Sequence, residues 1–383
     1  MKFIIDGNYN KELISLIVRE ELPVTHVIVH VPQNPIGNSS ILLPKVLPKF
    51  KEFEEYTKHI RDQELIPIAG IDSTCQGNFE AHMQQYKAVI SLFQTLKELE
   101  FKDILVSSPN NLGFVKENLP SMKIYLSHSQ YVTSLNRARI FFEIGAESII
   151  LHPDIIRSFQ MLKNLLKLKE KLNVSRGLDY ILPLNLGCNW GCIHWYQHHN
   201  MQSHRTLNSP VFNDQHKISD VKDEFDYPML YCWKKRLQEP INFLKAGWIS
   251  PDNIELYEEL GYKDFLLFTN GFSNEKILQI IKSYQNKSLD KDFQEFLNIP
   301  EPYGDYWLGS EVKNSKINLS PDVMKEFCTT FPYNNHYPTE HEIDIHCRNY
   351  IEKLRNGKNQ KIEQVINLIS NKMREMEKGV KGG

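Results

Sequence analysis

The sequence predicts an α/β protein built as a (β/α)8 barrel of the TIM type. Eight short apolar runs recur along the first part of the chain, and helix-forming stretches fill most of the gaps between them. Most runs are apolar throughout, as expected for parallel strands covered on both faces. Eight such units in about 280 residues match the usual size of this barrel. A doubly wound sheet is the alternative, but no GxGxxG or Walker A loop follows an early strand.

The predicted elements alternate regularly along the chain. The predicted strands cover residues 3–6, 26–31, 66–71, 103–107, 123–128, 148–152, 180–186 and 265–269. The predicted helices cover residues 11–20, 51–63, 80–99, 135–144, 155–172 and 274–284. In the fifth helix, Ile155, Phe159, Leu162 and Leu166 recur at helical spacing and form one apolar face.

The barrel is predicted to take up residues 1–290, with a long insertion at roughly 189–240 between strands seven and eight. Residues 291–383 form a C-terminal extension that we expect to be mostly helical and packed on the barrel. Its clearest pattern is a helical stripe of Ile362, Val365, Ile366, Ile369 and Met373. An interface with a partner protein or with a second copy of the chain is the alternative use of this stripe.

Composition and charge restrict the class of protein. Lys and Arg total 45 against 47 Asp and Glu, so the formal net charge is −2, and no basic face for tight nucleic-acid binding is indicated. The first residues hold too few consecutive apolar side chains for a secretory signal. No apolar run reaches the length of a membrane span. We therefore expect a cytoplasmic protein, whose six cysteines are not a disulfide framework.

Four of the cysteines follow strands of the predicted barrel. Cys75 follows strand three, Cys188 and Cys192 follow strand seven, and Cys232 lies in the insertion before strand eight. The loops after all strands of a barrel meet at its carboxyl-end face, where barrel enzymes build their active sites. Topology therefore predicts that four thiols, far apart in sequence, share one rim.

A metal centre is one interpretation of these thiols. Four thiolates suit a zinc ion or a [4Fe–4S] cluster, and one CxxxC pair with two isolated cysteines favours a cluster in a cavity over a zinc site. Incidental buried cysteines remain an alternative. So does a nucleophilic Cys192 with a nearby histidine as its base. Cys328 and Cys347 lie in predicted helices beyond the barrel, and we expect both to be buried.

Five blocks of the chain occur in an order that resembles one known family. They are GIDSTCQGNFE, YLSHSQYVTSLNRARIFFEIGAESIIL, HPDIIRSFQMLKNL, LNLGCNWGCIHWYQHHNMQSH and DYPMLYCWKKRLQEPINFLKAGWISPDNIELYEELGYKDFLLF. The family is the collagenase-like one, historically filed as peptidases of unknown catalytic type. It also contains UbiU and UbiV, the iron–sulfur proteins of oxygen-independent ubiquinone hydroxylation, and related proteins that hydroxylate RNA. The resemblance covers about residues 1–290.

The resemblance implies both a cofactor and a reaction. Cys75, Cys188, Cys192 and Cys232 would ligate a [4Fe–4S] cluster. The reaction would be hydroxylation without O2, or related redox chemistry, with an organic oxygen donor such as prephenate. The substrate would be an aromatic small molecule, RNA or a peptide, and the near-neutral charge disfavours RNA. Peptidase activity, and a non-catalytic subunit that binds a cluster beside a partner protein, are the alternatives.

Four histidines are candidate catalytic residues, because an imidazole with an ordinary pKa moves protons at neutral pH. His194, His199 and His204 follow the cysteine pair, and His128 ends strand five. His199 and His204 match the His-Asn and Ser-His positions of the family. A merely solvated, His-rich loop is the alternative interpretation.

Four further residues are candidates for substrate binding. Asp72 lies just before Cys75, His152 ends strand six, and Asn200 follows His199. Arg157 is expected either to pair with a carboxylate or to lie in solvent. Family members commonly carry basic residues after the cysteine pair, where this chain has His194, Trp195 and Tyr196. We therefore expect a diverged substrate pocket.

Overall fold

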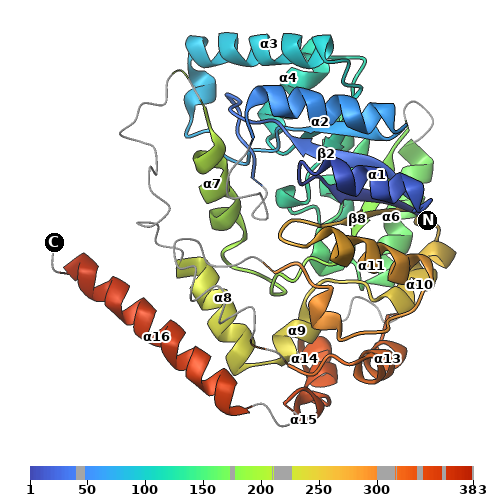
Figure 1. Cartoon of the computed structure of the whole chain (residues 1–383), viewed down its shortest axis with the longest axis vertical. Coiled ribbons are helices and arrows are strands. Elements are labelled where there is room, and N and C mark those ends of the chain that lie inside the picture. Colours follow the sequence, from blue (N-terminus) through green and yellow to red (C-terminus); the bar gives the residue numbers. More distant parts are fainter. Residues whose placement is uncertain are drawn as a thin grey trace.

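A computed structural model shows a closed barrel of eight parallel strands, which confirms the predicted fold (Figure 1). The structure describes residues 1–39, 48–172, 177–208, 210, 227–299, 315, 317–333, 340–355 and 359–381. The strands are β1 (Lys2–Asp6), β2 (Val24–His30), β3 (Ile66–Gly70), β4 (Asp103–Val106), β5 (Lys123–Leu126), β6 (Ser148–Ile150), β7 (Asp179–Pro183) and β8 (Asp264–Leu267). Each strand pairs in parallel with the next, and β8 closes the barrel on β1.

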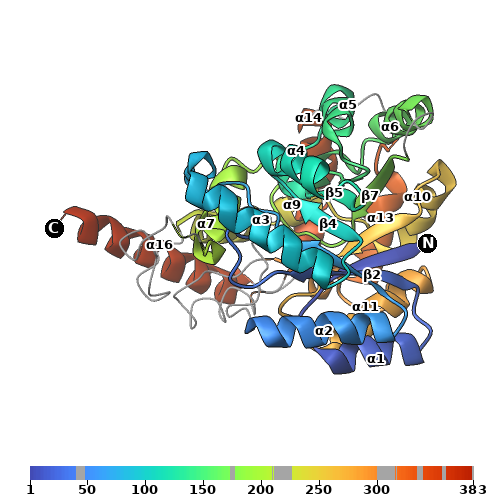
Figure 2. The same ribbon diagram turned by 90° about the horizontal axis from the view of Figure 1, so that it is seen from above.

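Helices surround the barrel, and Figure 2 shows α1 and α2 on one side of it and α4 and α5 on the opposite side. The helices between strands are α1 (Lys11–Arg19), α2 (Phe50–Asp62), α3 (Met83–Glu98), α4 (Pro109–Asn118), α5 (Leu135–Ile144), α6 (Phe159–Leu172) and α10 (Ile254–Leu260), and α11 (Asn274–Gln285) follows β8. Of these, α4 and α10 are not among the predicted helices, and in α4 the reason is that Gly113 and three asparagines form helices poorly. Pro109 at its first turn, a favoured position for proline, was the available signal.

Side-chain caps fix where several of these helices begin. Asn10 accepts a hydrogen bond from the backbone N–H of Leu13 at the start of α1. Ser134 caps α5 in the same way, and Ser273 caps α11. Such caps satisfy N–H groups that have no partner within the helix. They hold the loops after the strands in defined positions.

The barrel interior is filled with side chains. One residue from each strand contributes to an inner core: Ile4, Ile28, Ile68, Leu105, Tyr125, Ile150, Ile181 and Leu266. Leu186, Trp195 and Phe268 belong to the same core, and Cys188 and Cys192 pack against it. The interior is therefore a packed core rather than a pore, and the cysteine pair after β7 lies against it.

The insertion between β7 and β8 is helical. It contains α7 (Trp195–Thr206), α8 (Tyr227–Gln238) and α9 (Ile241–Lys245), and residues 211–226 lie outside the described part. The alternative of a solvated His-rich loop is wrong, because residues 195–206 form a helix whose His198 and His199 are buried.

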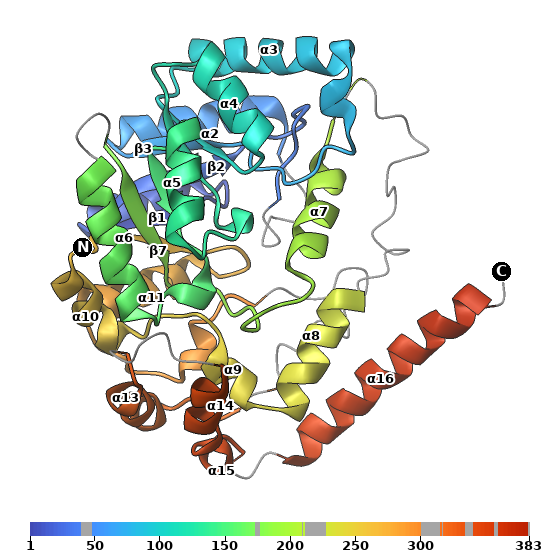
Figure 3. The ribbon, with the colours of Figure 1, turned by 180° about the vertical axis from the view of Figure 1, so that it is seen from behind.

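The C-terminal part is also helical, as predicted. It contains α13 (Pro321–Thr330), α14 (Glu340–Arg348), α15 (Ile351–Leu354) and α16 (Asn359–Lys381). α14 packs on α9, and α16 packs along α8 and projects beyond it, away from the barrel (Figure 3). The apolar stripe of α16 is buried, from Ile362 to Met373. Cys328 and Cys347 are buried in α13 and α14, as expected. No helix among the described residues is long and apolar enough to cross a membrane.

Candidate functional site

Polar side chains collect where the strands end. At or just after the carboxyl end, each strand contributes one buried polar residue: Asp6, His30, Asp72, Ser107, Ser127, His152, Asn185 and Thr269. We call these eight residues the polar rim. The carboxyl-end face is where barrel enzymes bind substrates, and so many polar groups are seldom buried there without a role. Of the eight, the sequence analysis singled out only Asp72 and His152.

Three of the four predicted thiol ligands come together beside this rim. Cys188 and Cys192 lie in the loop after β7, and Cys232 lies on α8. The thiols of Cys192 and Cys232 share a hydrogen bond. Cys188 is near enough to both to act on them electrostatically. We call Cys188, Cys192 and Cys232 the thiol trio.

A buried arginine faces the thiol trio. Arg236 lies one helical turn beyond Cys232 on α8 and is only 2% exposed. Its Nη2 atom donates a hydrogen bond to the carbonyl of Gly187, while its Nε and Nη1 atoms have no hydrogen-bond partner among the described residues. Burying a cation is costly unless an anion lies beside it. The arrangement therefore suits a negatively charged group at the trio.

The thiols of the trio differ in acidity. The hydrogen bond with Cys232 lowers the pKa of Cys192 to about 6, and Arg236 acts in the same direction. That same bond, together with burial, raises the pKa of Cys232. Burial raises the pKa of Cys188 to about 12. Of this hydrogen-bonded pair, Cys192 is therefore the thiol that more readily becomes a thiolate.

Cys75 lies apart from the trio, against α7. Its Sγ atom is 3.3 Å from Nε2 of His204, and the neighbouring Thr74 donates a hydrogen bond of 2.7 Å to Asn200 Oδ1. His204 is nine residues beyond Trp195, the first residue of α7, which is about 13 Å along the axis. The structure therefore brings three of the four predicted ligands together and holds the fourth near the other end of α7.

The donor set distinguishes between kinds of metal centre. Among the described residues, no three Cys, His, Asp or Glu side chains have the arrangement that a single metal ion needs. An iron–sulfur cluster is larger than one ion, so its cysteine ligands stand farther apart than those of a zinc ion. It also carries negative charge when bound by thiolates, which fits Arg236. The trio thus fits such a cluster better than it fits zinc, and Cys75 would join only by leaving His204.

Three predicted histidines pack around Trp195. Their ring centroids lie 4.2 Å (His152), 4.8 Å (His199) and 5.7 Å (His128) from the Trp195 ring. Burial lowers the pKa of all three, that of His199 to about 4. Burial therefore favours the neutral form of all three rings, whereas the sequence analysis assigned His128 and His199 an ordinary pKa; a catalytic role for these two histidines stays a prediction. Burial also lowers the pKa of the half-buried His204.

The remaining candidates of the insertion have local partners. Nδ1 of His194 is 3.2 Å from Oε1 of Gln197, and its ring is 5.3 Å from that of Tyr231. The backbone N–H of His194 donates to Cys192, so this residue adjoins the trio. Asn200 Oδ1 accepts a hydrogen bond from the Thr74 hydroxyl, and this bond helps to fix the loop that carries Cys75. A role for Asn200 in substrate binding stays a prediction.

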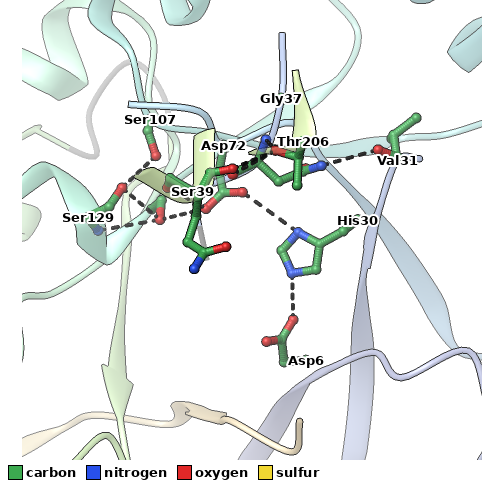
Figure 4. A network of polar contacts seen from close by, with 12 residues as sticks. Asp6, His30, Val31, Gly37, Ser39, Asp72, Ser107, Ser129 and Thr206 are labelled. Carbon is green, nitrogen blue, oxygen red and sulfur yellow. Dashed lines mark hydrogen bonds and ion pairs between the residues drawn. The ribbon is translucent and has the colours of Figure 1, made fainter. Parts of the chain in front are cut away.

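A charged network on the rim was missed by the sequence analysis (Figure 4). Nε2 of His30 lies 2.8 Å from Asp6 Oδ1, and its Nδ1 lies 3.7 Å from Asp72 Oδ1. Burial alone would lower the pKa of His30, but the two carboxylates outweigh it and raise this pKa. Ser39 and Ser127 each donate a hydrogen bond of 3.2 Å to Asp72 Oδ2. The network could have been recognised in the sequence from Asp6 and His30, because each is a polar residue at the end of an apolar run.

Arg157 has a structural position: it does not lie in solvent, and within the described ranges no ion pair with a carboxylate is found for it. It is buried, and its two terminal nitrogens donate to the carbonyls of Leu244 and Ala246. Its guanidinium lies 3.8 Å from the ring of Trp248 and 5.7 Å from that of Phe327 in α13. Arg157 therefore joins the loop after β6 to the insertion and to the C-terminal helices.

Comparison with known proteins supports the fold. A solved structure of a U32 peptidase aligns with a TM-score of 0.53 and 16% identity over 71% of this chain and 93% of that chain. A chitinase from Aspergillus fumigatus aligns with a TM-score of 0.38 and 8% identity over 71% and 92% of the two chains. No family model and no curated protein matches the chain. The first likeness shows a shared barrel fold, and the second is too distant to carry an argument.

Proposed function

We propose that this chain is an iron–sulfur barrel enzyme whose cluster is held by Cys188, Cys192 and Cys232. The observation that carries the proposal is the convergence of these three thiols on the buried, incompletely bonded Arg236. Resemblance adds Cys75 as a fourth ligand, and its contact with His204 makes it the movable one. A bound cluster would supply electrons, or a Lewis acid at an iron without a cysteine ligand.

The residues around the trio would prepare the site for chemistry on a bound substrate. His128, His152 and Trp195 form an aromatic, uncharged surface that excludes water. His30 holds a proton between two carboxylates, on the β1 to β3 side of the rim. Proton-holding and electron-transferring groups would thus lie on different sides of one barrel end.

The reaction class and the partners follow from the resemblance. Oxygen-independent hydroxylation, or related redox modification, of an aromatic small molecule, a peptide or RNA is the proposed reaction. The formal net charge of −2 makes RNA the weakest of these substrates. The resemblance also leads us to propose prephenate as the oxygen donor. It further suggests that a protein partner, or a second copy of the chain, binds the C-terminal extension. The barrel fold shared with a U32 peptidase is compatible with them.

Iron and acid-labile sulfide, measured on protein purified without oxygen, test the proposal. We expect about four of each per chain, with a visible absorption band from the thiolate-bound cluster. Cys188→Ser, Cys192→Ser and Cys232→Ser should each lose the iron, whereas Cys347→Ala, in α14, should keep it. One zinc ion per chain, or folded protein without any metal, would overturn the proposal.

Hydrolysis by a nucleophilic cysteine is the second candidate. It is favoured by the position of Cys192, which is partly exposed and hydrogen-bonded to the Cys232 thiol. A gelatin-cleavage assay on metal-free protein tests it. Cleavage that Cys192→Ser abolishes and Cys75→Ser retains would establish a cysteine hydrolase. Absence of cleavage, or cleavage that survives Cys192→Ser, would exclude it.

A further inference from the structure

A continuous chain of polar contacts crosses the β8, β1, β2 and β3 side of the barrel end. Figure 4 shows its part from Asp6 through His30 and Asp72 to Ser39. Asn270 Nδ2 donates to Asp6 Oδ2 over 2.6 Å, and Asp6 contacts His30, which faces Asp72. Asp72 accepts a hydrogen bond from Ser39, whose carbonyl lies 2.6 Å from Nδ1 of His199. We call these six residues the rim network. None of them belongs to the thiol trio.

The rim network contains more hydrogen-bond acceptors than donors. His199 Nδ1 must carry the proton, because it meets a carbonyl, so its Nε2 is an acceptor. This Nε2 atom and Asn270 Oδ1 have no hydrogen-bond partner among the described residues, and Asp72 Oδ1 has only the ion pair with His30 Nδ1, which at 3.7 Å is too long for a hydrogen bond. The three side chains are at most 7% exposed. Buried acceptors without a hydrogen bond are rare in native proteins, so two without any partner and a third with only a long ion pair indicate a donor from outside the chain.

The charge of the rim network also restricts what can bind. Two carboxylates, Asp6 and Asp72, face the single ring of His30, whose pKa they raise. The neutral rings of His128 and His199 complete the surroundings. Burial raises the pKa of the Tyr9 and Tyr56 hydroxyls near Asp6, so they stay uncharged. Neither carboxylate is paired with a lysine or arginine within the described ranges. The balance is negative and repels anions.

We propose that the rim network binds hydroxyl or amine groups of a small ring compound and discriminates against carboxylates and phosphates. Such groups supply the donors that Asp72, Asn270 and His199 lack. The aromatic rings of His128 and Phe268, whose centroids are 5.1 Å apart, lie on the same side as His199 and offer contact for a ring. A dicarboxylate such as prephenate is disfavoured at this network. The inference goes beyond the proposed function and needs no metal.

The test uses three probes that share a phenol ring: 3-hydroxybenzyl alcohol, 3-hydroxybenzylamine and 3-hydroxybenzoate. Their binding to the full-length protein is measured by ligand-observed NMR, with and without iron. We expect the alcohol and the amine to bind at least about tenfold more tightly than the benzoate, because only they can donate to the network. The three probes should have the same order of affinity for metal-free protein. This test can therefore succeed even if the protein binds no iron.

Two isosteric variants separate the network from general effects. Asp72→Asn should weaken binding of the alcohol and the amine by about tenfold, because a charged acceptor becomes a neutral one. Asp179→Asn, at the start of β7 and paired with Lys123 and Lys169, should bind as the wild type does. Equal or tighter binding of the benzoate, or no saturable binding of any probe, would overturn the inference. If Asp72→Asn does not fold, the order of the three probe affinities for the wild-type protein still tests the inference.

Discussion

Nε2 of His204 lies 3.3 Å from Sγ of Cys75, so the loop after β3 and the last turn of α7 are joined through a thiol and an imidazole. The two hydrogen bonds from Thr74, its Oγ1 to Asn200 (2.7 Å) and its N–H to Ser203 (3.0 Å), strengthen this junction. The contact keeps Cys75 away from the other three predicted ligands. The four cysteines should therefore differ in how much each contributes to holding iron, and this difference can be measured.

The first prediction concerns this inequality. We expect Cys75→Ser to retain most of the iron, because the trio and Arg236 hold the cluster without it. Cys192→Ser should retain almost none. Iron and sulfide analysis of anaerobically purified variants measures the difference. Equal losses in the two variants would show that Cys75 leaves His204 when the cluster assembles.

The second prediction concerns pH. Asp154 accepts hydrogen bonds from the N–H of Gly191 (3.1 Å) and the hydroxyl of Tyr131 (3.2 Å), but burial dominates and raises its pKa to about 7. Between the unfolded pKa near 4 and this value, the folded state binds a proton that the unfolded state lacks. The contribution of Asp154 to stability is therefore fully present below pH 4 and is lost as the pH rises through 7.

Asp154→Asn should remove this component. Urea unfolding of metal-free protein at pH 5 and pH 8 measures it, and the wild type should lose up to about 3 kcal/mol that the variant does not lose, because about two pH units of the interval between the unfolded and the folded pKa fall between these pH values. Glu98→Gln, at an exposed position at the end of α3, serves as the control and should follow the wild type. A variant with the wild-type difference between the two pH values would contradict the assignment.

The third prediction compares two glycines. A Cβ atom on Gly70 would lie 2.8 Å from Nδ1 of His30 and 3.2 Å from its Cα, so Gly70→Ala must push the ring away from Asp72. We expect a loss of about 1–3 kcal/mol in the free energy of unfolding. Gly113 in α4 has nothing within 4 Å of its Cβ position, so Gly113→Ala should instead stabilise the protein by about 0.5–1 kcal/mol. Chemical denaturation distinguishes these opposite signs.

The fourth prediction concerns Arg157. Lysine keeps the charge but cannot donate to both the Leu244 and Ala246 carbonyls or stack as a plane on Trp248. Arg157→Lys should lower the free energy of unfolding by about 2 kcal/mol or more, as for other broken buried hydrogen bonds. It should also speed proteolysis of the C-terminal helices. Arg139→Lys, at an exposed pair with Glu143, should change stability by less than about 0.5 kcal/mol.

The sequence was sufficient to predict the barrel, because its strands are apolar on both faces and need no long-range information to recognise. It did not predict α4, whose glycine and asparagines oppose the helix that packing on the barrel imposes. The shared rim of the cysteines followed from topology. The separation of Cys75 did not, because it depends on the course of α7 through the insertion.

The burial and the contacts of individual side chains also could not be predicted from the sequence. His128 and His199 were judged by their ordinary pKa, yet their burial around Trp195 lowers that pKa and favours the neutral ring. Arg157 was predicted either to pair with a carboxylate or to lie in solvent, whereas packing buries its guanidinium against the ring of Trp248. Asp6 and His30 belong to strands that pair in the barrel, β1 and β2, but their ion pair becomes visible only once the strands are in register.

The packing of α16 along α8 has a consequence for biosynthesis. α8 carries Cys232 and Arg236, whereas α16 is the last helix described and leaves the ribosome long after the barrel strands. Until it arrives, the side of α8 that it covers is exposed, so the helix that carries Cys232 lacks this part of its packing. Maturation of the thiol site is therefore expected after translation rather than during it. A nascent or prematurely terminated chain that lacks α16 would close its barrel but carry an unfinished site.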